Sequence, residues 1–210
     1  MEITVFTVNP FQENTFVVRE GTDAVVVDPG FATQAEFGAF RKMIEESAVG
    51  LKAVLLTHAH VDHVMGLQRV LDYYQVPVYL SHADLHLWDN YMPQAALFGI
   101  QAQPFIFTPH DYPKGRLEIG NLTFEVLPTP GHSPDHVSLH SAVNGVLIAG
   151  DVVFRESIGR TDLYKGDFAV LERSIREKLY VLPDNTRVLP GHGPETSIGH
   201  EKRFNPFVSA

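Results

Sequence analysis

The feature that most constrains this chain is the seven-residue run T-H-A-H-V-D-H, at positions 57–63. In an extended segment, side chains two residues apart point to the same side of the chain. His58 and His60 are therefore expected to face one metal ion together. Asp62 and His63 follow a change of backbone direction where a helix is predicted to begin, so they face elsewhere and can bind a second, adjacent ion.

A single His or Asp follows each of three further apolar runs. These positions are Pro130-Gly131-His132 after Leu122–Leu127, Gly150-Asp151 after Gly145–Ala149, and Gly191-His192-Gly193-Pro194 after Thr186–Leu189. Each time a predicted strand ends, a glycine allows a sharp turn, and one polar side chain stands at the exit. Because such exits can converge at one edge of a sheet, a common place for active sites in α/β proteins, we expect these side chains to form one site.

The order H-x-H-x-D-H, then a lone His, a lone Asp and a final His, resembles the metallo-β-lactamase superfamily. Within it, the chain most resembles the single-domain glyoxalase II-like (hydroxyacylglutathione hydrolase-like) proteins. The resemblance implies an α/β fold, a four-layer αβ/βα sandwich of two mixed sheets with helices outside and metals at one edge. The predicted strand-rich and helical blocks occur twice, the second starting near Arg116, which agrees with a two-half fold.

The resemblance also implies a ligand set for two divalent metal ions. It assigns His58, His60 and His132 to the first ion, Asp62, His63 and His192 to the second, and Asp151 as a bridge between them. Asp62 and Asp151 are the candidate catalytic residues. A two-metal site supplies hydroxide near neutral pH and stabilises the oxyanion of an attacked carbonyl. Imidazole with carboxylate suits zinc, iron and manganese alike.

Two further residues are predicted to support the ligands. Asp28 stands at a strand exit after Val25–Val27, where the superfamily has an acid, and metal-bound imidazoles generally donate their other N–H to such a group. His136, four residues after His132, is the second. For both, plain turn and strand roles are the alternatives. The remaining histidines, among them the helically spaced pair His82 and His86, lie outside the motif.

Arg160 is the candidate substrate-binding residue. It lies in the segment G-R-T-D shortly after Asp151. In glyoxalase II a lysine near this point holds the glutathione part of the substrate, so Arg160 is expected to bind an anionic group. The alternative is an ion pair with Asp162 that shapes the loop. Glyoxalase II also carries a C-terminal helical domain that binds glutathione, and we expect none after Ala210, which weakens the case for glutathione itself.

The predicted function is metal-dependent hydrolysis of a small-molecule thioester such as S-D-lactoylglutathione. The alternative is a persulfide dioxygenase, because these enzymes share the ligand order and the G-R-T-D segment but use one iron at the three-His site. The β-lactamases of this superfamily typically lack a bridging acid at the position of Asp151, so the resemblance disfavours a β-lactamase. The flavo-diiron oxidoreductases carry an acid at the position of His60, so that branch is disfavoured too. A phosphodiesterase or nuclease is less favoured, since the net charge is −9 and no basic stripe is present.

Length and composition limit the domain number, the chemistry and the location of the protein. A chain of 210 residues, 44% hydrophobic and 20% charged, predicts one globular domain, 1–210. No apolar run approaches the roughly 20 residues that span a bilayer, and no secretory signal is recognisable at the start. There is no cysteine, so neither a disulfide nor a thiolate ligand can form. The expected location is the cytoplasm, with no membrane or nucleic-acid partner.

Periodicity predicts the remaining elements. A helix is expected over Gln34–Ser47, a second from His63 to Tyr74 and a third starting at Ser81 as N-cap. The segment Tyr91–Pro113 reads as a loop, either a lid or a packed connection. Further strands and helices are expected at Ile3–Val8, Thr15–Arg19, Ala24–Val27, Leu51–Leu56, Val76–Leu80, Arg116–Ile119, Val137–His140, Asp167–Leu179 and His200–Phe204.

Overall fold

The computed structural model describes Met1–Ser209 and divides the chain into two compact units, each built on a mixed sheet. The first unit comprises Met1–Tyr112 with Glu118–Leu122, and the second comprises Pro113–Leu117 with the chain from Thr123 onward. The predicted α/β class is therefore confirmed. Among the described residues no helix is long and apolar enough to cross a membrane.

The sheet of the first unit has the order β1-β2-β3-β4-β5. Its strands are β1 (Glu2–Val8), β2 (Glu13–Glu20), β3 (Asp23–Val27), β4 (Gly50–Leu55) and β5 (Val78–Tyr79). The first three pair antiparallel, whereas β3, β4 and β5 run parallel. Because parallel strands end at the same edge, the residues that follow β3 and β4 come together there.

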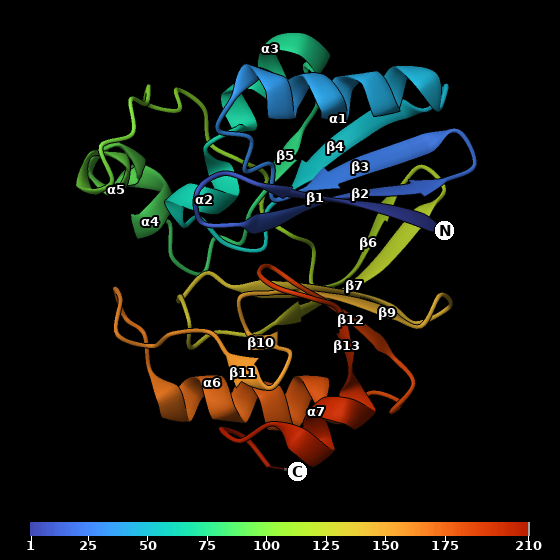
Figure 1. Ribbon diagram of the computed structural model, residues 1–210, viewed down its shortest axis with the longest axis vertical. Helices are drawn as coiled ribbons and strands as arrows, with labels where there is room; N and C mark the ends of the chain where they lie inside the picture. Colours follow the sequence, from blue (N-terminus) through green and yellow to red (C-terminus); the bar gives the residue numbers. More distant parts are fainter. Residues whose placement is uncertain (210) are drawn as a thin grey trace. The chain divides into compact units, whose positions relative to one another are not determined.

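The helices of this unit are α1 (Gln34–Glu46), α2 (Val61–Val64), α3 (Leu67–Tyr74), α4 (His86–Asp89) and α5 (Tyr91–Leu97). In Figure 1, α1 and α3 lie along the same face of the first sheet. The apolar stripe of α1, with Phe37 and Phe40, shares one core with Val26 of β3 and Val54 of β4. Phe40 also stacks on Phe31, with ring centroids 5.0 Å apart.

The predicted helix from His63 to Tyr74 is wrong in one respect, because it is broken into α2 and α3. At the break, the Gly66 N–H donates to the Pro29 carbonyl oxygen at 2.8 Å. A Cβ at Gly66 would lie 2.5 Å from the Phe31 backbone nitrogen. Glycine alone permits this close approach of two backbones, and the approach redirects the chain after the ligand run.

Two further predictions in this unit are wrong. Ser81 does not cap a helix, because its Oγ accepts the Ala83 N–H in a turn and α4 begins only at His86. The predicted loop Tyr91–Pro113 contains helix α5. Pro93 suggested a loop, but it lies in the first turn of α5, where an N–H has no partner within the helix.

The sheet of the second unit has the order β13-β12-β9-β8-β7-β6. β9 pairs parallel with β12 and antiparallel with β8. A short hairpin, β10-β11, follows β9 and was not predicted. The strands are β6 (Gly115–Ile119), β7 (Leu122–Pro128), β8 (Val137–Ser141), β9 (Val146–Gly150), β10 (Val153–Phe154), β11 (Ser157–Ile158), β12 (Arg187–Pro190) and β13 (Thr196–Ser197).

The helices of the second unit are α6 (Phe168–Ser174), which continues into the π-helical turn η1 (Ile175–Leu179), and α7 (Ile198–Phe204). Figure 1 shows α6 and α7 on the same face of this sheet. Leu171 and Ile175 pack in one core with Leu147 and Val188 of the sheet. The helix predicted over Asp167–Leu179 is confirmed, with Asp167 as its N-cap.

We expect Phe40→Ala to cost about 3–5 kcal/mol of unfolding free energy, because it removes a fully buried ring from the core of the first unit. Urea denaturation followed by circular dichroism measures the loss. The control is Leu97→Ala, at a side chain 83% exposed, which should change stability by less than about 0.5 kcal/mol. Equal effects of the two substitutions would contradict the assigned core.

Candidate metal centre

The ligand run of the first unit forms a tight cluster of imidazoles. It follows β4, and His60 is the residue from which α2 begins. The His58 ring centroid lies 4.8 Å from that of His60 and 4.2 Å from that of His63. All three side chains are buried. The turn into α2 thus brings the third imidazole back beside the first, and predicted ligands of two different ions lie next to each other.

Asp28 joins the ends of β3 and β4. It has a φ of 49°, a left-handed conformation that is uncommon outside glycine. Its Oδ1 accepts the Thr57 backbone N–H at 2.7 Å, and its Oδ2 accepts the Thr57 hydroxyl at 2.6 Å. The same Oδ2 lies 3.0 Å from Nδ1 of His63. Asp28 therefore occupies the supporting position predicted for it, against the ligand run.

These hydrogen bonds define which ring nitrogens carry protons. Thr57 gives its one hydroxyl proton to Asp28, so its oxygen accepts from Nδ1–H of His58, 3.0 Å away. The Asp28 carboxylate likewise accepts from Nδ1–H of His63. With the proton on Nδ1, a neutral imidazole presents the Nε2 lone pair as its metal ligand.

Glu13 is a neighbour of this cluster that the sequence reasoning missed. Its Oε1 lies 3.9 Å from Nδ1 of His63, and its Oε2 accepts the Thr15 hydroxyl at 3.0 Å. Burial raises the pKa of the Glu13 carboxyl well above its ordinary value, and the charge of Asp28 adds to the rise. The sequence signal was an acid at the start of an apolar strand, which is not specific.

In the second unit, Asp151 lies between two imidazoles. Its Oδ2 is 3.6 Å from Nε2 of His132 and 3.5 Å from Nε2 of His192. The strand exits that carry Asp151 and His192 are joined, because the Gly191 N–H donates to the Gly150 carbonyl at 2.9 Å. A single carboxylate oxygen between two Nε2 atoms is the arrangement that a bridging ligand needs.

His136 supports Asp151 through a directed chain of hydrogen bonds. The Asp151 N–H donates to Nε2 of His136 at 3.0 Å, so the ring proton is on Nδ1. Nδ1–H donates to the Thr129 hydroxyl at 2.9 Å. Thr129 in turn donates to Ser138, whose hydroxyl donates to the Ala149 carbonyl. Both His136 nitrogens are thus used, and the residue orients the backbone at Asp151, as a supporting residue would.

Arg160 contacts the site through its backbone. Its carbonyl oxygen accepts from Nδ1 of His132 at 2.8 Å, which leaves Nε2 as the ligand atom. Gly159 permits this, since a Cβ there would lie 1.9 Å from the Asp151 carbonyl oxygen. This positioning role of the backbone was not predicted.

The Arg160 side chain forms the ion pair with Asp162 that was the alternative interpretation. Both nitrogen-to-oxygen distances are 2.7 Å, and the guanidinium is 62% exposed. The pair lowers the pKa of Asp162 to about 2. Substrate binding by Arg160 stays a prediction, and any such role would have to be compatible with this ion pair.

The donor chemistry of each unit suits a divalent metal. In the first unit, the buried rings of His58 and His63 lie side by side, with centroids 4.2 Å apart, and Asp28 supports them through Thr57 and through Nδ1 of His63. In the second, the carboxylate oxygen of Asp151 lies close to two Nε2 atoms. Buried imidazoles held as neutral Nδ1–H tautomers, with carboxylates beside them, bind zinc, iron or manganese.

Of the other histidines, His82 lies in the turn before α4 and contacts the Pro109 carbonyl oxygen through Nε2 at 2.9 Å. His86 is the first residue of α4. The two therefore do not share one helix face. His140 and His200 pair with Glu125 and Glu156.

Two mixed sheets with histidines and aspartates at their strand exits define an α/β metal-binding protein. The chain matches the sequence pattern described as Metallo-beta-lactamase superfamily over residues 8–192, and it belongs to that family. The predicted membership of this superfamily is therefore confirmed. The chain is 38% identical to the probable metallo-hydrolase YqgX of Bacillus subtilis, over 96% of this chain and 95% of the relative. It is 35% identical to the hydroxyacylglutathione hydrolase GloC of Haemophilus influenzae, over 100% and 99%.

Solved structures agree with the fold. The crystal structure of BLEG-1 B3 metallo-beta-lactamase is similar with a TM-score of 0.87 and 38% identity, over 100% of both chains. The structure of TTHA1623 in a di-iron-bound form has a TM-score of 0.87 and 36% identity, over 98% of this chain and 100% of the other. Both likenesses extend across the two units of the chain.

We expect Asp28→Asn to lower metal affinity by about 10- to 100-fold, because an amide nitrogen would replace an oxygen that accepts from Thr57 or His63. Metal content after dialysis against a chelator, measured by elemental analysis, tests this. Asp23→Asn is the matched control, since Asp23 is also a buried acid but lies at the opposite end of β3, where it accepts the Asn121 N–H. Equal metal content in both variants would remove Asp28 from the site.

Proposed function

We propose that the protein hydrolyses a small-molecule thioester of the hydroxyacylglutathione class with two divalent metal ions. The proposal assigns the seven predicted ligands as the family resemblance implies, and it treats residues 1–210 as one catalytic domain. The observation that carries it is Asp151, whose Oδ2 lies within 3.6 Å of two imidazole Nε2 atoms. The similarity to a hydroxyacylglutathione hydrolase over nearly the whole of both chains supports the choice of substrate class.

When bound at these residues, the two ions supply hydroxide near neutral pH and polarise the acyl carbonyl. The residues of the chain provide the geometry for that chemistry. Thr57 and Asp28 hold His58 and His63, and the Arg160 carbonyl holds His132. Ligands that are already held in place need no rearrangement during the reaction. Electrostatic stabilisation of the transition state is most effective under that condition.

Proton transfer falls to the carboxylates. The Asp62 Oδ2 lies 3.7 Å from Nε2 of His63, and Asp151 lies between His132 and His192. Because both would hold metal ions, each would offer the carboxylate oxygen that is not used for metal binding as the proton acceptor when the carbonyl carbon is attacked. The leaving group is a thiolate, and because a thiol has a pKa of about 8.5, it departs without a strong general acid. The reaction therefore needs no further acid residue.

A second candidate is β-lactam hydrolysis, favoured by the 38% identity to a protein described as a B3 metallo-beta-lactamase. Asp151, the acid predicted to bridge the two ions, favours the thioester, because the resemblance implies that β-lactamases typically lack a bridging acid at this position. The persulfide dioxygenase keeps the same ligand order and is distinguished by its single iron and its use of oxygen.

We expect the purified protein to hold about two metal ions per chain and to hydrolyse S-D-lactoylglutathione without oxygen. Elemental analysis and an anaerobic thioester assay test this, on zinc- and iron-loaded protein. His192→Ala should leave about one ion and cut turnover by at least about 10-fold, whereas His82→Ala, outside the predicted ligand set, should change neither.

Two parallel assays cover the rival reactions. An oxygen electrode with glutathione persulfide reports dioxygenase activity, and a chromogenic cephalosporin reports β-lactam hydrolysis. Oxygen uptake with one iron and no thioesterase activity would overturn the proposal in favour of the dioxygenase. Cephalosporin turnover exceeding thioester turnover would overturn it in favour of the β-lactamase.

The role of Arg160 is tested by comparing it with its ion-pair partner. If Arg160 binds an anionic group of the substrate, Arg160→Ala should raise KM by about 10-fold or more with a smaller effect on kcat. Asp162→Ala removes the same ion pair but leaves the guanidinium, so it should change KM much less. Equal kinetic effects of the two substitutions would show that the pair only shapes the loop.

A further inference from the structure

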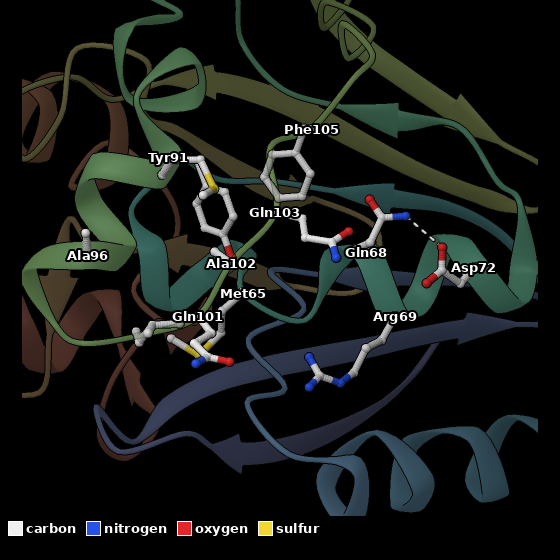
Figure 2. A pocket seen from close by; sticks show the side chains of 12 residues that line it. Met65, Gln68, Arg69, Asp72, Tyr91, Ala96, Gln101, Ala102, Gln103 and Phe105 are labelled. Carbon is white, nitrogen blue, oxygen red and sulfur yellow. Dashed lines mark hydrogen bonds between the residues drawn. The ribbon is translucent and has the colours of Figure 1, made fainter.

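The first unit contains a hollow that the proposed chemistry does not use. It has a volume of about 670 Å³ and lies between α3, α5 and the segment after α5 (Figure 2). None of the predicted metal ligands lines it, and Met65, two residues after His63, is the lining residue nearest to them in sequence. Its volume is in the range of small-molecule sites.

One wall of the hollow is aromatic. The rings of Tyr91 and Phe105 line it and stack with centroids 4.6 Å apart. The Trp88 ring also stacks on Phe105, with centroids 4.4 Å apart. Met65 and Ala102 add further apolar surface. These aromatic and apolar side chains can contact the hydrocarbon part of a ligand.

Arg69 is the one cationic residue among those that line the hollow. Its side chain is half-buried, and in Figure 2 it extends from α3 toward the side on which Gln101 lies. No carboxylate among residues 1–209 forms an ion pair or a hydrogen bond with it. Burial raises the pKa of the Tyr91 hydroxyl, and the charge of Arg69 offsets part of that rise, so the guanidinium acts on the hollow.

Asp72, the acid that lines the hollow, already has a hydrogen-bond partner. Asp72 accepts a hydrogen bond from Nε2 of Gln68 at 2.7 Å, drawn as a dashed line in Figure 2. A guanidinium pairs with a carboxylate through two parallel hydrogen bonds, which makes it selective for planar anions. With one cation and one acid at the hollow, a singly charged ligand fits better than a doubly charged phosphate.

We propose that this hollow binds a small organic monocarboxylate, with its carboxylate on Arg69 and its hydrocarbon part against Tyr91 and Phe105. Amides of Gln101 and Gln103, which also line the hollow, are available to polar groups near the carboxylate. This inference does not depend on the proposed hydrolase function, because it uses residues outside the predicted metal ligands.

Ligand binding in the hollow can be followed by the intrinsic fluorescence of the protein. Trp88 is its one tryptophan, and it stacks on a ring that lines the hollow. We would titrate the metal-loaded protein with hexanoate and with the uncharged hexanamide, following Trp88 fluorescence and the heat of binding by calorimetry. We expect saturable binding of hexanoate with Kd in the millimolar range or tighter, and binding of hexanamide about 10-fold or more weaker.

Arg69→Gln should weaken hexanoate about 10-fold or more and leave hexanamide unchanged, because it removes the charge but keeps hydrogen-bonding atoms. Arg173→Gln, at an exposed arginine of α6, makes the same change in net charge and should have no effect. Ala102→Phe, which fills the hollow, should weaken both compounds, with circular dichroism as the check on folding.

Several outcomes would overturn the inference. One is the absence of both a saturable fluorescence change and a heat of binding. Another is equal affinity for hexanoate and hexanamide, or hexanoate binding that survives Arg69→Gln. Binding that survives Arg69→Gln but is lost in His132→Ala would place the carboxylate at the predicted metal ligands instead. Thioester hydrolysis enters none of these measurements, so failure here leaves the proposed hydrolase function untouched.

Discussion

The arrangement of the first unit's ligands depends on the buried carboxylate of Asp28. Its two oxygens accept from the backbone and hydroxyl of Thr57 and contact Nδ1 of His63. Leaving any of these buried donors without a partner would cost about 1–3 kcal/mol, so the group holds β3, the end of β4 and α2 in one arrangement. The left-handed backbone at Asp28 is a local cost that this network offsets.

The sequence predicted the strands that carry the ligands better than the helices around them. Apolar runs such as those of β3, β4 and β9 end in polar residues, and that pattern is local and survives in the fold. The break between α2 and α3 depends instead on the approach of Gly66 to Pro29, two segments far apart in sequence. Helical periodicity contains no information about such a contact, so a continuous helix was predicted.

The same distinction holds for the site. Asp28 and His136 were identified as supporting residues because each occupies a strand exit or a ligand loop, which is visible in the sequence. Thr57, Glu13 and the Arg160 carbonyl were not, although each contacts a predicted ligand or its partner. A threonine next to a histidine, an acid at the start of a strand and a backbone oxygen have no distinctive spacing, and their roles follow only from the packed structure.

The anchors of the imidazoles differ in charge, and the difference bears on how many metals are held. His58 and His132, predicted ligands of the first ion, donate Nδ1–H to a hydroxyl and a carbonyl, both neutral. His63, a predicted ligand of the second ion, donates to the Asp28 carboxylate. A carboxylate partner makes an imidazole a stronger donor to a metal. Asp62 adds a second carboxylate beside His63. The ligands assigned to the second ion thus carry the larger negative charge, which supports the proposal that a second metal ion is bound.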